Sequence, residues 1–400
     1  MKAFVAGVSM LALAACGQSE TATTNQKDEA KRIAQETIVI DTHIDVPYRL
    51  DRKWEDVSHS THGGDFDYNR AVEGGLNAPF MSIYTPAAYD GTPKAKEHAL
   101  EMIAIVNRMV SEAPDKYIVA KTVADVEKAF KDGKIALPLG MENGSPVSGD
   151  LNNLDYFFEL GIRYITLAHS KANHISDSSY DVNRPNDGLS DFGKDAVKHM
   201  NDLGIMVDIS HVSDKAFWDV MEITKTPVIA SHSSARKFTP NFERNMSDDM
   251  IKALTTNGSV IMINYGSAFV TEEANQYGPK RTEAYTKYLA ENNLTTSSEL
   301  EAEFAKEYSK ENPYPFATLD DVLDHIDHVV EIAGVDYVGI GSDYDGVGDS
   351  LPEGLKDVST YPNLVEGLLK RGYTEENIKK ILSGNLLRVW RTVEAYAAAN

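Results

Sequence analysis

Residues 38–47 read Ile38-Val39-Ile40-Asp41-Thr42-His43-Ile44-Asp45-Val46-Pro47, a β-branched run that ends in polar residues and a proline. The apolar run predicts a buried strand, and Pro47 prevents that strand from continuing. Because side chains alternate along a strand, His43 and Asp45 are expected to point the same way and could share one divalent cation. Polar residues at the carboxyl end of an apolar strand are typical of the mouth of an α/β barrel.

The same pattern recurs along the chain. Further apolar runs, each followed by polar residues, lie at 75–84, 134–140, 163–168, 205–209, 227–230, 259–264 and 337–340. Helical patterns separate these runs, so the sequence predicts an α/β fold, a (β/α)₈ barrel of the TIM type. A doubly wound sheet would show a similar alternation. The barrel is favoured because no Gly-x-Gly-x-x-Gly follows a strand and the polar residues gather at many strand ends.

Two helical segments lie outside this repeating unit. Residues 270–316 are highly charged and helical in pattern, and their length indicates a functional insertion such as a lid or an oligomer contact. Residues 361–398 predict a helical C-terminal tail. No second domain boundary is visible, so residues 33–400 are expected to form one barrel domain. On the helix near residue 325, His325 and His328 are expected to occupy a solvated face rather than to bind a metal.

The first residues indicate export. Lys2 is followed by an apolar run that ends at Cys16, directly after small residues, and this arrangement resembles a bacterial lipobox. It implies a signal peptide over 1–15, diacylation of Cys16 and a flexible tether over 16–32. Gly17 favours the outer membrane of a bacterial envelope, with the barrel facing the periplasm or the exterior. An ordinary signal peptide that is cut nearby is the alternative.

Composition excludes several function classes. Cys16 is the only cysteine, so the folded body has no disulfide within the chain, no Cys-ligated zinc and no Cys nucleophile. The net charge of −22 argues against a nucleic-acid partner, because the phosphates would be repelled. An anionic group on a substrate would therefore need a dedicated cation.

Seven polar side chains at the predicted strand ends could meet at one rim of the barrel. They are His43, Asp45, Glu142, His169, His211, His232 and Asp343. They outnumber the ligands that one zinc needs, so two metal ions that share Glu142 as a bridging carboxylate are the economical solution. A water between two cations could supply hydroxide near neutral pH. Asp343 would then be free to shuttle a proton from that water to a leaving amine.

These residues lie in longer motifs, which also include Arg244. The motifs are Asp41-Thr42-His43-Ile44-Asp45-Val46-Pro47, Gly140-Met141-Glu142-Asn143-Gly144, Thr166-Leu167-Ala168-His169-Ser170, Asp208-Ile209-Ser210-His211-Val212-Ser213, Ser231-His232-Ser233-Ser234-Ala235, Arg244-Asn245, Gly339-Ile340-Gly341-Ser342-Asp343-Tyr344-Asp345-Gly346 and Gly384-Asn385-Leu386-Leu387-Arg388-Val389. In this order, and over roughly residues 33–395, they closely resemble the membrane (renal) dipeptidase family, whose members are binuclear zinc peptidases on an amidohydrolase-type barrel.

The resemblance implies a role for each site residue. His43 and Asp45 would hold one zinc, His211 and His232 the other, and Glu142 would bridge them. His169 would contact the scissile carbonyl and its developing oxyanion, and Asp343 would do the acid–base work. Arg244 would bind the substrate's terminal carboxylate, which makes physical sense because a planar guanidinium contacts a carboxylate through two parallel hydrogen bonds.

The sequence therefore predicts an exported, lipid-anchored dipeptidase with two Zn²⁺ per chain. Its substrates would be dipeptides with a free C-terminal carboxylate, both L,L and, because the family tolerates D-residues at the second position, L,D. Mammalian members carry disulfides, so a homodimer of this chain is expected without that linkage. The alternatives are another binuclear amidohydrolase, such as a deacylase or a lactonase, and a non-enzymatic solute-binding lipoprotein. The intact acid–base set argues against the latter.

Overall fold

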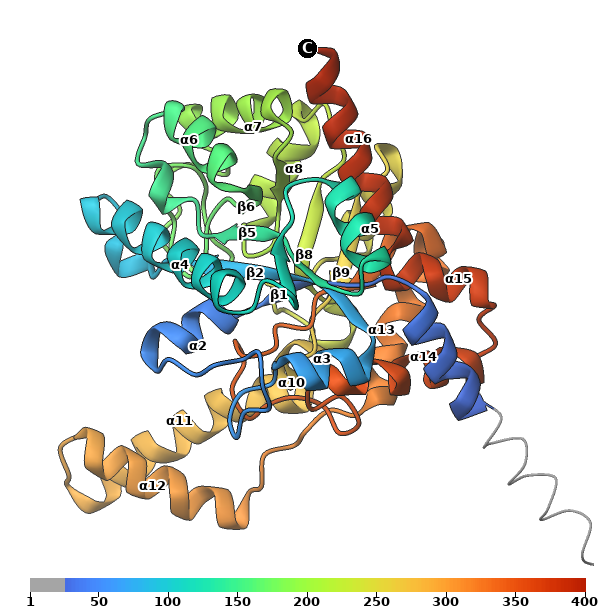
Figure 1. The fold of residues 1–400 in the computed structure, drawn as a ribbon. Coiled ribbons are helices and arrows are strands. Elements are labelled where there is room, and N and C mark those ends of the chain that lie inside the picture. The colour runs from blue at the N-terminus through green and yellow to red at the C-terminus, as the bar shows by residue number, and fades with distance from the viewer. Residues whose placement is uncertain (1–25) are drawn as a thin grey trace, which may run out of the picture.

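The computed structural model describes residues 26–400 (Figure 1). The predicted signal peptide, Cys16 and most of the tether lie outside these residues. Residues 26–36 are helical, so the prediction of a flexible tether is wrong for residues 26–32. The reason is packing, because Ala30, Ile33 and Ala34 are buried and Gln35 donates hydrogen bonds to the carbonyls that end a neighbouring helix.

Eight parallel strands form the barrel. In spatial order they are β1 (Val39–Ile44), β2 (Leu76–Tyr84), β5 (Leu139–Glu142), β6 (Ile162–Thr166), β7 (Met206–Asp208), β8 (Ile229–Ser233), β9 (Val260–Ile263) and β10 (Val338–Ile340). The sheet closes where Asp45 N–H donates to Tyr344 O at 2.8 Å and Asp343 N–H donates to His43 O at 3.1 Å. The predicted (β/α)₈ barrel is confirmed.

Helices follow the strands along the chain and surround the barrel (Figure 1). They are α2 (Val46–Arg52), α3 (Tyr68–Gly74), α4 (Pro93–Glu112), α5 (Val123–Lys131), α6 (Asn152–Leu160), α7 (Asp191–Leu203), α8 (Asp214–Ile223), α9 (Asp248–Ala253), α10 (Ser267–Val270), α13 (Leu319–Ile332), α14 (Tyr361–Lys370), α15 (Glu375–Lys379) and α16 (Asn385–Ala399). Side chains inside the barrel form a buried cluster with α16, in which Trp390 lies 5.3 Å from Phe80 between ring centroids. The predicted C-terminal tail thus helps to fill the barrel.

The run at 134–140 differs from the single strand that the sequence predicts. It contains β4 (Ile135–Leu137), which pairs with β3 (Tyr117–Val119) in a separate two-stranded sheet, and the first residues of barrel strand β5. Pro138 separates β4 from β5. Because proline has no N–H to donate, it interrupts the hydrogen-bond ladder at this point.

A helical hairpin occupies the predicted insertion. Its arms are α11 (Glu272–Asn292) and α12 (Ser298–Glu311), which project from the barrel (Figure 1). Aromatic rings hold the two arms together, with Tyr285 and Phe304 5.2 Å apart between centroids. Among residues 26–400, no helix combines the length and the apolar character that crossing a bilayer requires.

The two histidines of α13 are buried, so their predicted solvated face is wrong. His325 accepts the Ala235 N–H at Nδ1 and contacts Val270 O at Nε2, both at 2.9 Å. His328 Nε2 lies 2.8 Å from Asp248 Oδ1. This face of α13 packs against the loops that follow β8 and against α10, and its histidines join those elements through hydrogen bonds.

Candidate metal centre

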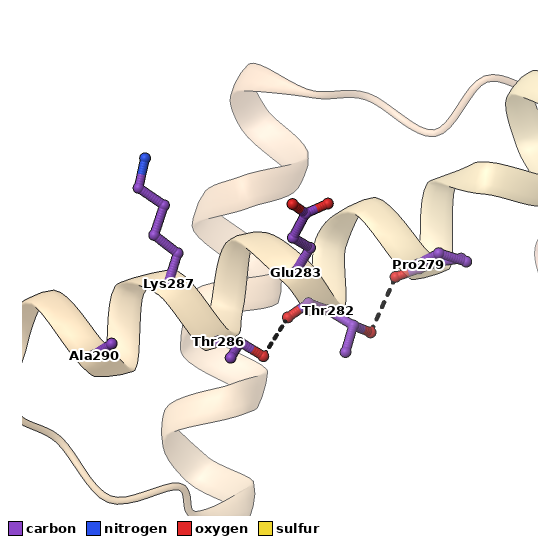
Figure 2. A pocket seen from close by; sticks show the side chains of 7 residues that line it. Pro279, Thr282, Glu283, Thr286, Lys287 and Ala290 are labelled. Carbon is purple, nitrogen blue, oxygen red and sulfur yellow. Dashed lines mark hydrogen bonds between the residues drawn. The ribbon is translucent and has the colours of Figure 1, made fainter.

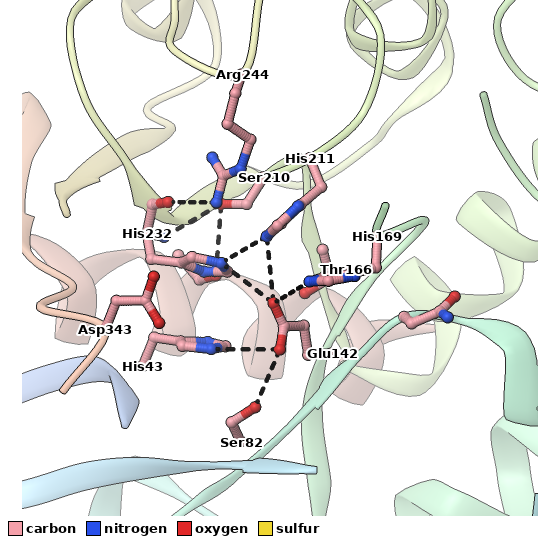
Figure 3. A network of polar contacts seen from close by, with 12 residues as sticks. His43, Ser82, Glu142, Thr166, His169, Ser210, His211, His232, Arg244 and Asp343 are labelled. Carbon is pink, nitrogen blue, oxygen red and sulfur yellow. Dashed lines mark hydrogen bonds and ion pairs between the residues drawn. The ribbon is translucent and has the colours of Figure 1, made fainter. Parts of the chain in front are cut away.

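The seven predicted strand-end residues converge at one end of the barrel. Figure 3 labels all of them except Asp45. His43 lies in β1 and Asp45 just beyond it, Glu142 is the last residue of β5, and His232 lies within β8. The remaining three, His169, His211 and Asp343, follow β6, β7 and β10. Parallel strands bring their carboxyl ends to one rim, and for that reason residues hundreds of positions apart meet here.

Glu142 is the centre of the cluster. Its Oε1 lies 3.2 Å from His211 Nε2, 3.3 Å from His232 Nε2 and 3.5 Å from His169 Nε2. Its Oε2 lies on the other side, 3.5 Å from His43 Nε2. One carboxylate therefore presents its two oxygens to two different sets of imidazoles.

The donor atoms have the spacing of metal ligands. His43 Nε2 is 3.3 Å from Asp45 Oδ2 and has no hydrogen-bond partner among the described residues, although it is buried. Ligands that surround a zinc ion at its usual bond lengths stand about 3.3 Å from one another. His211 Nε2 and His232 Nε2 are 2.8 Å apart, and two such nitrogens need a proton or a cation between them. These residues fit a divalent metal.

Three groups of side chains bring their ligand atoms within 4.8 Å of one another. They are His43, Glu142 and His232; Glu142, His169 and His211; and His43, Asp45 and Asp343. The groups share members, so their side chains form one continuous cluster rather than separate sites. Its donors are imidazole nitrogens and carboxylate oxygens, a set that suits zinc and other first-row divalent metals.

Electrostatics in the metal-free protein also favour a cation. Burial opposes ionisation of Glu142, but the surrounding histidines outweigh it and hold the pKa of Glu142 well below its usual range. Burial lowers the pKa of His211 and of His232 well below that of a free imidazole, so both rings are neutral and keep a lone pair for a metal. His43 differs: burial lowers its pKa, but Tyr164, Asp45 and Glu142 outweigh burial and raise the pKa well above that of a free imidazole, so this ring would release a proton when a metal binds.

Asp343 is held in an unusual conformation beside the cluster. Its φ is 67°, in the left-handed region, and Asn264 Nδ2 donates a 2.8 Å hydrogen bond to its Oδ2. Burial raises the pKa of Asp343 to about 7 in the metal-free protein, and the neighbouring carboxylates of Asp45 and Glu142 add to the rise while His43 opposes it. His211 also has a left-handed φ, of 68°. Backbone strain of this kind gathers at functional sites.

A cavity of about 570 Å³ opens onto this cluster. Its lining residues are Asp45, Tyr48, Tyr84, Glu142, His169, Ser170, Tyr180, His211, Ala268, Phe269, Asp343, Gly346, Val347 and Ser350. The volume is in the range of small-molecule sites, and the lining combines aromatic walls with a few charged groups. His169 forms one wall, where its ring packs edge-on against Tyr84 at 4.9 Å.

Arg244 is buried next to His232 (Figure 3), with 3% of its surface exposed. Its Nη1 donates to Ser233 Oγ at 2.6 Å and its Nη2 donates to His232 O at 2.7 Å. Its Nε has no partner among the described residues. The predicted carboxylate-binding residue therefore lies beside the cluster, where two of its five N–H donors are used and three remain.

Two buried aspartates of the site were missed by the sequence analysis. Asp41 accepts the backbone N–H groups of His43 and Ser342, which ties β1 to the end of β10. Asp208 accepts those of Ser210 and Ser231, which ties β7 to β8. Each precedes a histidine of the cluster by two or three residues. That spacing is a usable signal, but their partners on other strands cannot be read from the sequence.

A second and larger hollow, of about 880 Å³, lies away from this chemistry along α11 (Figure 2). Its lining comes from this one helix and includes Glu283 and Lys287 but no histidine. Thr282 and Thr286 donate their hydroxyl protons to backbone carbonyls of the same helix. The hollow is a surface groove without converging polar groups, so the cavity at the metal cluster is the better candidate site.

Comparisons with known proteins agree with this geometry. The family model for membrane dipeptidase, peptidase family M19, matches residues 27–400. A probable dipeptidase from Pseudomonas aeruginosa is similar in structure, with a TM-score of 0.82, 26% identity, and coverage of 94% of this chain and 100% of that one. A metallopeptidase from Rhodobacter sphaeroides, solved with a phosphinate mimic of the dipeptide L-Ala-D-Ala, has a TM-score of 0.72 and 25% identity over 89% of this chain and 99% of that one.

Proposed function

The chain belongs to the membrane dipeptidase family, peptidase family M19, and we propose that it hydrolyses dipeptides with a free C-terminal carboxylate by means of two Zn²⁺ ions. The broader activity, dipeptide hydrolysis by a metallopeptidase, follows from the family and from dipeptidases of similar structure. The observation that carries the proposal is the central position of Glu142, whose two oxygens face different sets of histidines.

The proposed ligands divide at Glu142. His43 and Asp45 would hold one ion together with Glu142 Oε2, and His211 and His232 would hold the other together with Glu142 Oε1. When bound, the ions would lower the pKa of a water molecule and polarise the scissile carbonyl. The exact pairing of ligands with ions is part of the proposal.

Asp343 would move the proton of the reaction. Its Oδ2 is occupied by the amide of Asn264, which leaves Oδ1 to take a proton from the attacking water and to pass it to the leaving amine. A carboxylate within reach of both the water and the amine can accept the proton and then donate it. His169, whose pKa is lowered by burial, would be a neutral donor to the oxyanion that develops on the scissile carbonyl.

Arg244 would bind the substrate's carboxylate. Burial strengthens a guanidinium–carboxylate pair, and the hydrogen bonds to Ser233 and His232 fix the orientation of this guanidinium before substrate arrives. The R. sphaeroides neighbour was solved with a mimic of L-Ala-D-Ala, which supports the inclusion of L,D dipeptides among the proposed substrates.

The test combines metal content with a panel of substrates. About two zinc ions per chain are expected, with cleavage of L,L and L,D dipeptides that chelation abolishes and Zn²⁺ restores. Dipeptide amides, in which the carboxylate is masked, should be cleaved about 100-fold less efficiently, since a buried charge would lose its partner. Asp343→Asn should bind dipeptides but not turn them over.

The other outcomes separate the alternatives. Cleavage of masked and free substrates alike would favour a deacylase or another amidohydrolase. Tight binding of dipeptides with no turnover by the wild-type protein, metal-loaded, would favour a solute-binding role. A protein that takes up no metal would contradict the proposal outright.

We also propose that the chain is exported and anchored to a bacterial envelope through lipid on Cys16, with the outer membrane favoured. The support is the apolar run that ends in small residues before Cys16. A lipid anchor would hold the barrel at a membrane surface while the folded residues face the aqueous phase.

A further inference from the structure

The histidines at the cluster differ in what their second ring nitrogen touches. A histidine that binds metal through Nε2 must carry its proton on Nδ1, and a partner for that N–H selects this tautomer. His43 Nδ1 lies 2.8 Å from the hydroxyl of Tyr164, and His232 Nδ1 lies 2.7 Å from the hydroxyl of Ser231. A hydroxyl can donate or accept, so the direction of each bond depends on where the hydroxyl proton goes.

The hydroxyl proton of Tyr164 is donated to an acceptor other than His43. Its hydroxyl donates to the backbone carbonyl of Thr42 at 3.0 Å, and that carbonyl cannot donate in return. Tyr164 is fully buried, so water does not compete for the hydroxyl. The remaining lone pairs of the tyrosine oxygen face His43 Nδ1, which must then be the donor.

The hydroxyl proton of Ser231 is likewise donated to an acceptor other than its histidine. Its hydroxyl donates to Asp208 Oδ2 at 2.6 Å, and Asp208, fully buried, accepts further hydrogen bonds from the backbone N–H groups of Ser210 and Ser231. A carboxylate that is surrounded by donors is an acceptor only. The Ser231 oxygen therefore accepts from His232 Nδ1.

The other two histidines lack such partners. Within residues 26–400, neither His169 Nδ1 nor His211 Nδ1 has a hydrogen-bond partner, although both atoms are buried. Contact with a hydroxyl is thus not a general feature of histidines at this rim. It is confined to one histidine on each side of Glu142, which are His43 on the Oε2 side and His232 on the Oε1 side.

We propose that Tyr164 and the Ser231–Asp208 pair are positioning residues, which hold His43 and His232 in the tautomer and ring orientation that metal binding needs. Each oxygen of Glu142 thus faces one histidine that is fixed in this way, and each of these two histidines contacts its own hydroxyl. The inference rests on the proposed metal-dependent function. It goes beyond that function because it assigns a measurable share of the metal affinity to three residues that are neither proposed metal ligands nor part of the cavity lining.

The test measures Zn²⁺ affinity by competition with a chromophoric chelator. Tyr164→Phe and Ser231→Ala should each weaken one of the two binding events by about 10–100-fold, the usual effect of losing such a partner. The double variant should weaken both binding events, and because the rings of His43 and His232 stack 3.8 Å apart between centroids, the two losses should be coupled rather than additive. The matched controls are Tyr117→Phe and Ser234→Ala, whose buried hydroxyls donate to backbone carbonyls but touch no histidine. Each should bind Zn²⁺ within twofold of the wild type.

A second measurement keeps the inference falsifiable if a variant folds poorly. In the zinc-loaded wild-type protein, long-range ¹⁵N–¹H NMR should show His43 and His232 protonated at Nδ1. Rings protonated at Nε2, or well-folded variants whose Zn²⁺ affinity equals that of the wild type, would overturn it. If the wild type binds Zn²⁺ tightly but cleaves no dipeptide, the proposed function fails and these affinity predictions stand. If it binds no Zn²⁺, both fail.

Discussion

Gly346 shows how little space the two acidic side chains of the site leave. A Cβ at this position would lie 2.2 Å from Asp343 Oδ1 and 2.3 Å from Asp45 Oδ2. The φ of Gly346 is not in the left-handed region, so the backbone itself would accept another residue. Glycine is needed here for space, because any side chain would displace the proposed proton shuttle and a proposed metal ligand together.

Gly346→Ala should therefore lower kcat/KM for a dipeptide by about 100-fold, the cost of a displacement on the order of 1 Å at a reacting group. The control is Gly278→Ala in α11, where a Cβ meets no atom within 4 Å and activity should not change. Steady-state kinetics of both variants, with metal content measured beside them, makes the comparison. Activity within threefold of the wild type would show that the two carboxylates can move aside without harm.

The residues that could be predicted are those whose position in a strand already carries the chemistry. His43, Glu142 and His232 end apolar runs, and the barrel brings the ends of such runs together. Tyr164 could not be predicted, because in the sequence it is one more apolar residue of a strand. Its contact with His43 spans 121 positions and depends on how two non-adjacent strands face each other across the barrel.

At the scale of elements, α13 shows that a polar pattern can be buried. The sequence places His325 among acidic residues, which is typical of an exposed face, yet the ring is fully buried and uses both nitrogens. Accepting the Ala235 N–H at Nδ1 requires a neutral ring. Burial lowers the pKa of His325 to about 4 from its usual 6.5.

This shift predicts how stability depends on pH. Between pH 6.5 and 4 the unfolded chain protonates His325 while the folded chain does not, so the free energy of unfolding falls as the pH falls through this window. The loss is about 1.4 kcal/mol per pH unit and about 3 kcal/mol in total. Above pH 6.5 both states carry a neutral ring, and this contribution is constant.

Urea unfolding of chelated protein, at several pH values, can isolate this histidine. His325→Asn removes the titration, so its unfolding free energy should depend less steeply on pH than that of the wild type between pH 4 and 6.5. His59→Asn, at a side chain that is 72% exposed, is the control and should keep the wild-type slope. Equal slopes for His325→Asn and the wild type would show that other groups dominate the acid response.

The sequence predicts a strand or helix correctly where the local pattern of apolar residues is enough to specify it. All eight barrel strands coincide with predicted apolar runs. The run at 134–140, however, contains two strands with different partners: the part before Pro138 pairs with Tyr117–Val119, and the part after it joins the barrel. The sequence pattern does not show this change of pairing. Residues 26–32 belong to the segment predicted as a tether, because their apolar positions are few. They are ordered as a helix by contacts with segments far along the chain, such as the ion pair of Arg32 with Glu375.

At the scale of the whole molecule, the net charge of the chain repels anionic substrates, whereas the charges proposed for the site would attract their carboxylate. The chain carries a formal charge of −22, and its field repels anions that approach from solution. Within the site, buried Arg244 and the proposed metal ions would attract a substrate carboxylate. The two effects differ in range, because surface fields are screened within about 8 Å at physiological salt whereas contacts in a buried site are screened much less.

The difference in range predicts an opposite salt dependence for substrates of opposite charge. Raising NaCl from about 10 to 150 mM shortens the screening length from about 30 to 8 Å. A dipeptide with an acidic side chain should then be cleaved several-fold more efficiently, because long-range repulsion weakens, while a dipeptide with a basic side chain loses attraction and should be cleaved less efficiently. A neutral dipeptide should change less than twofold. The measurement is kcat/KM for the three substrates across the salt series, with metal loading held constant.

If all three respond alike, salt acts on the site itself and the acidic surface has no part in selecting substrates. If they separate by charge, the surface of the barrel discriminates among dipeptides before Arg244 and the metal cluster contact them.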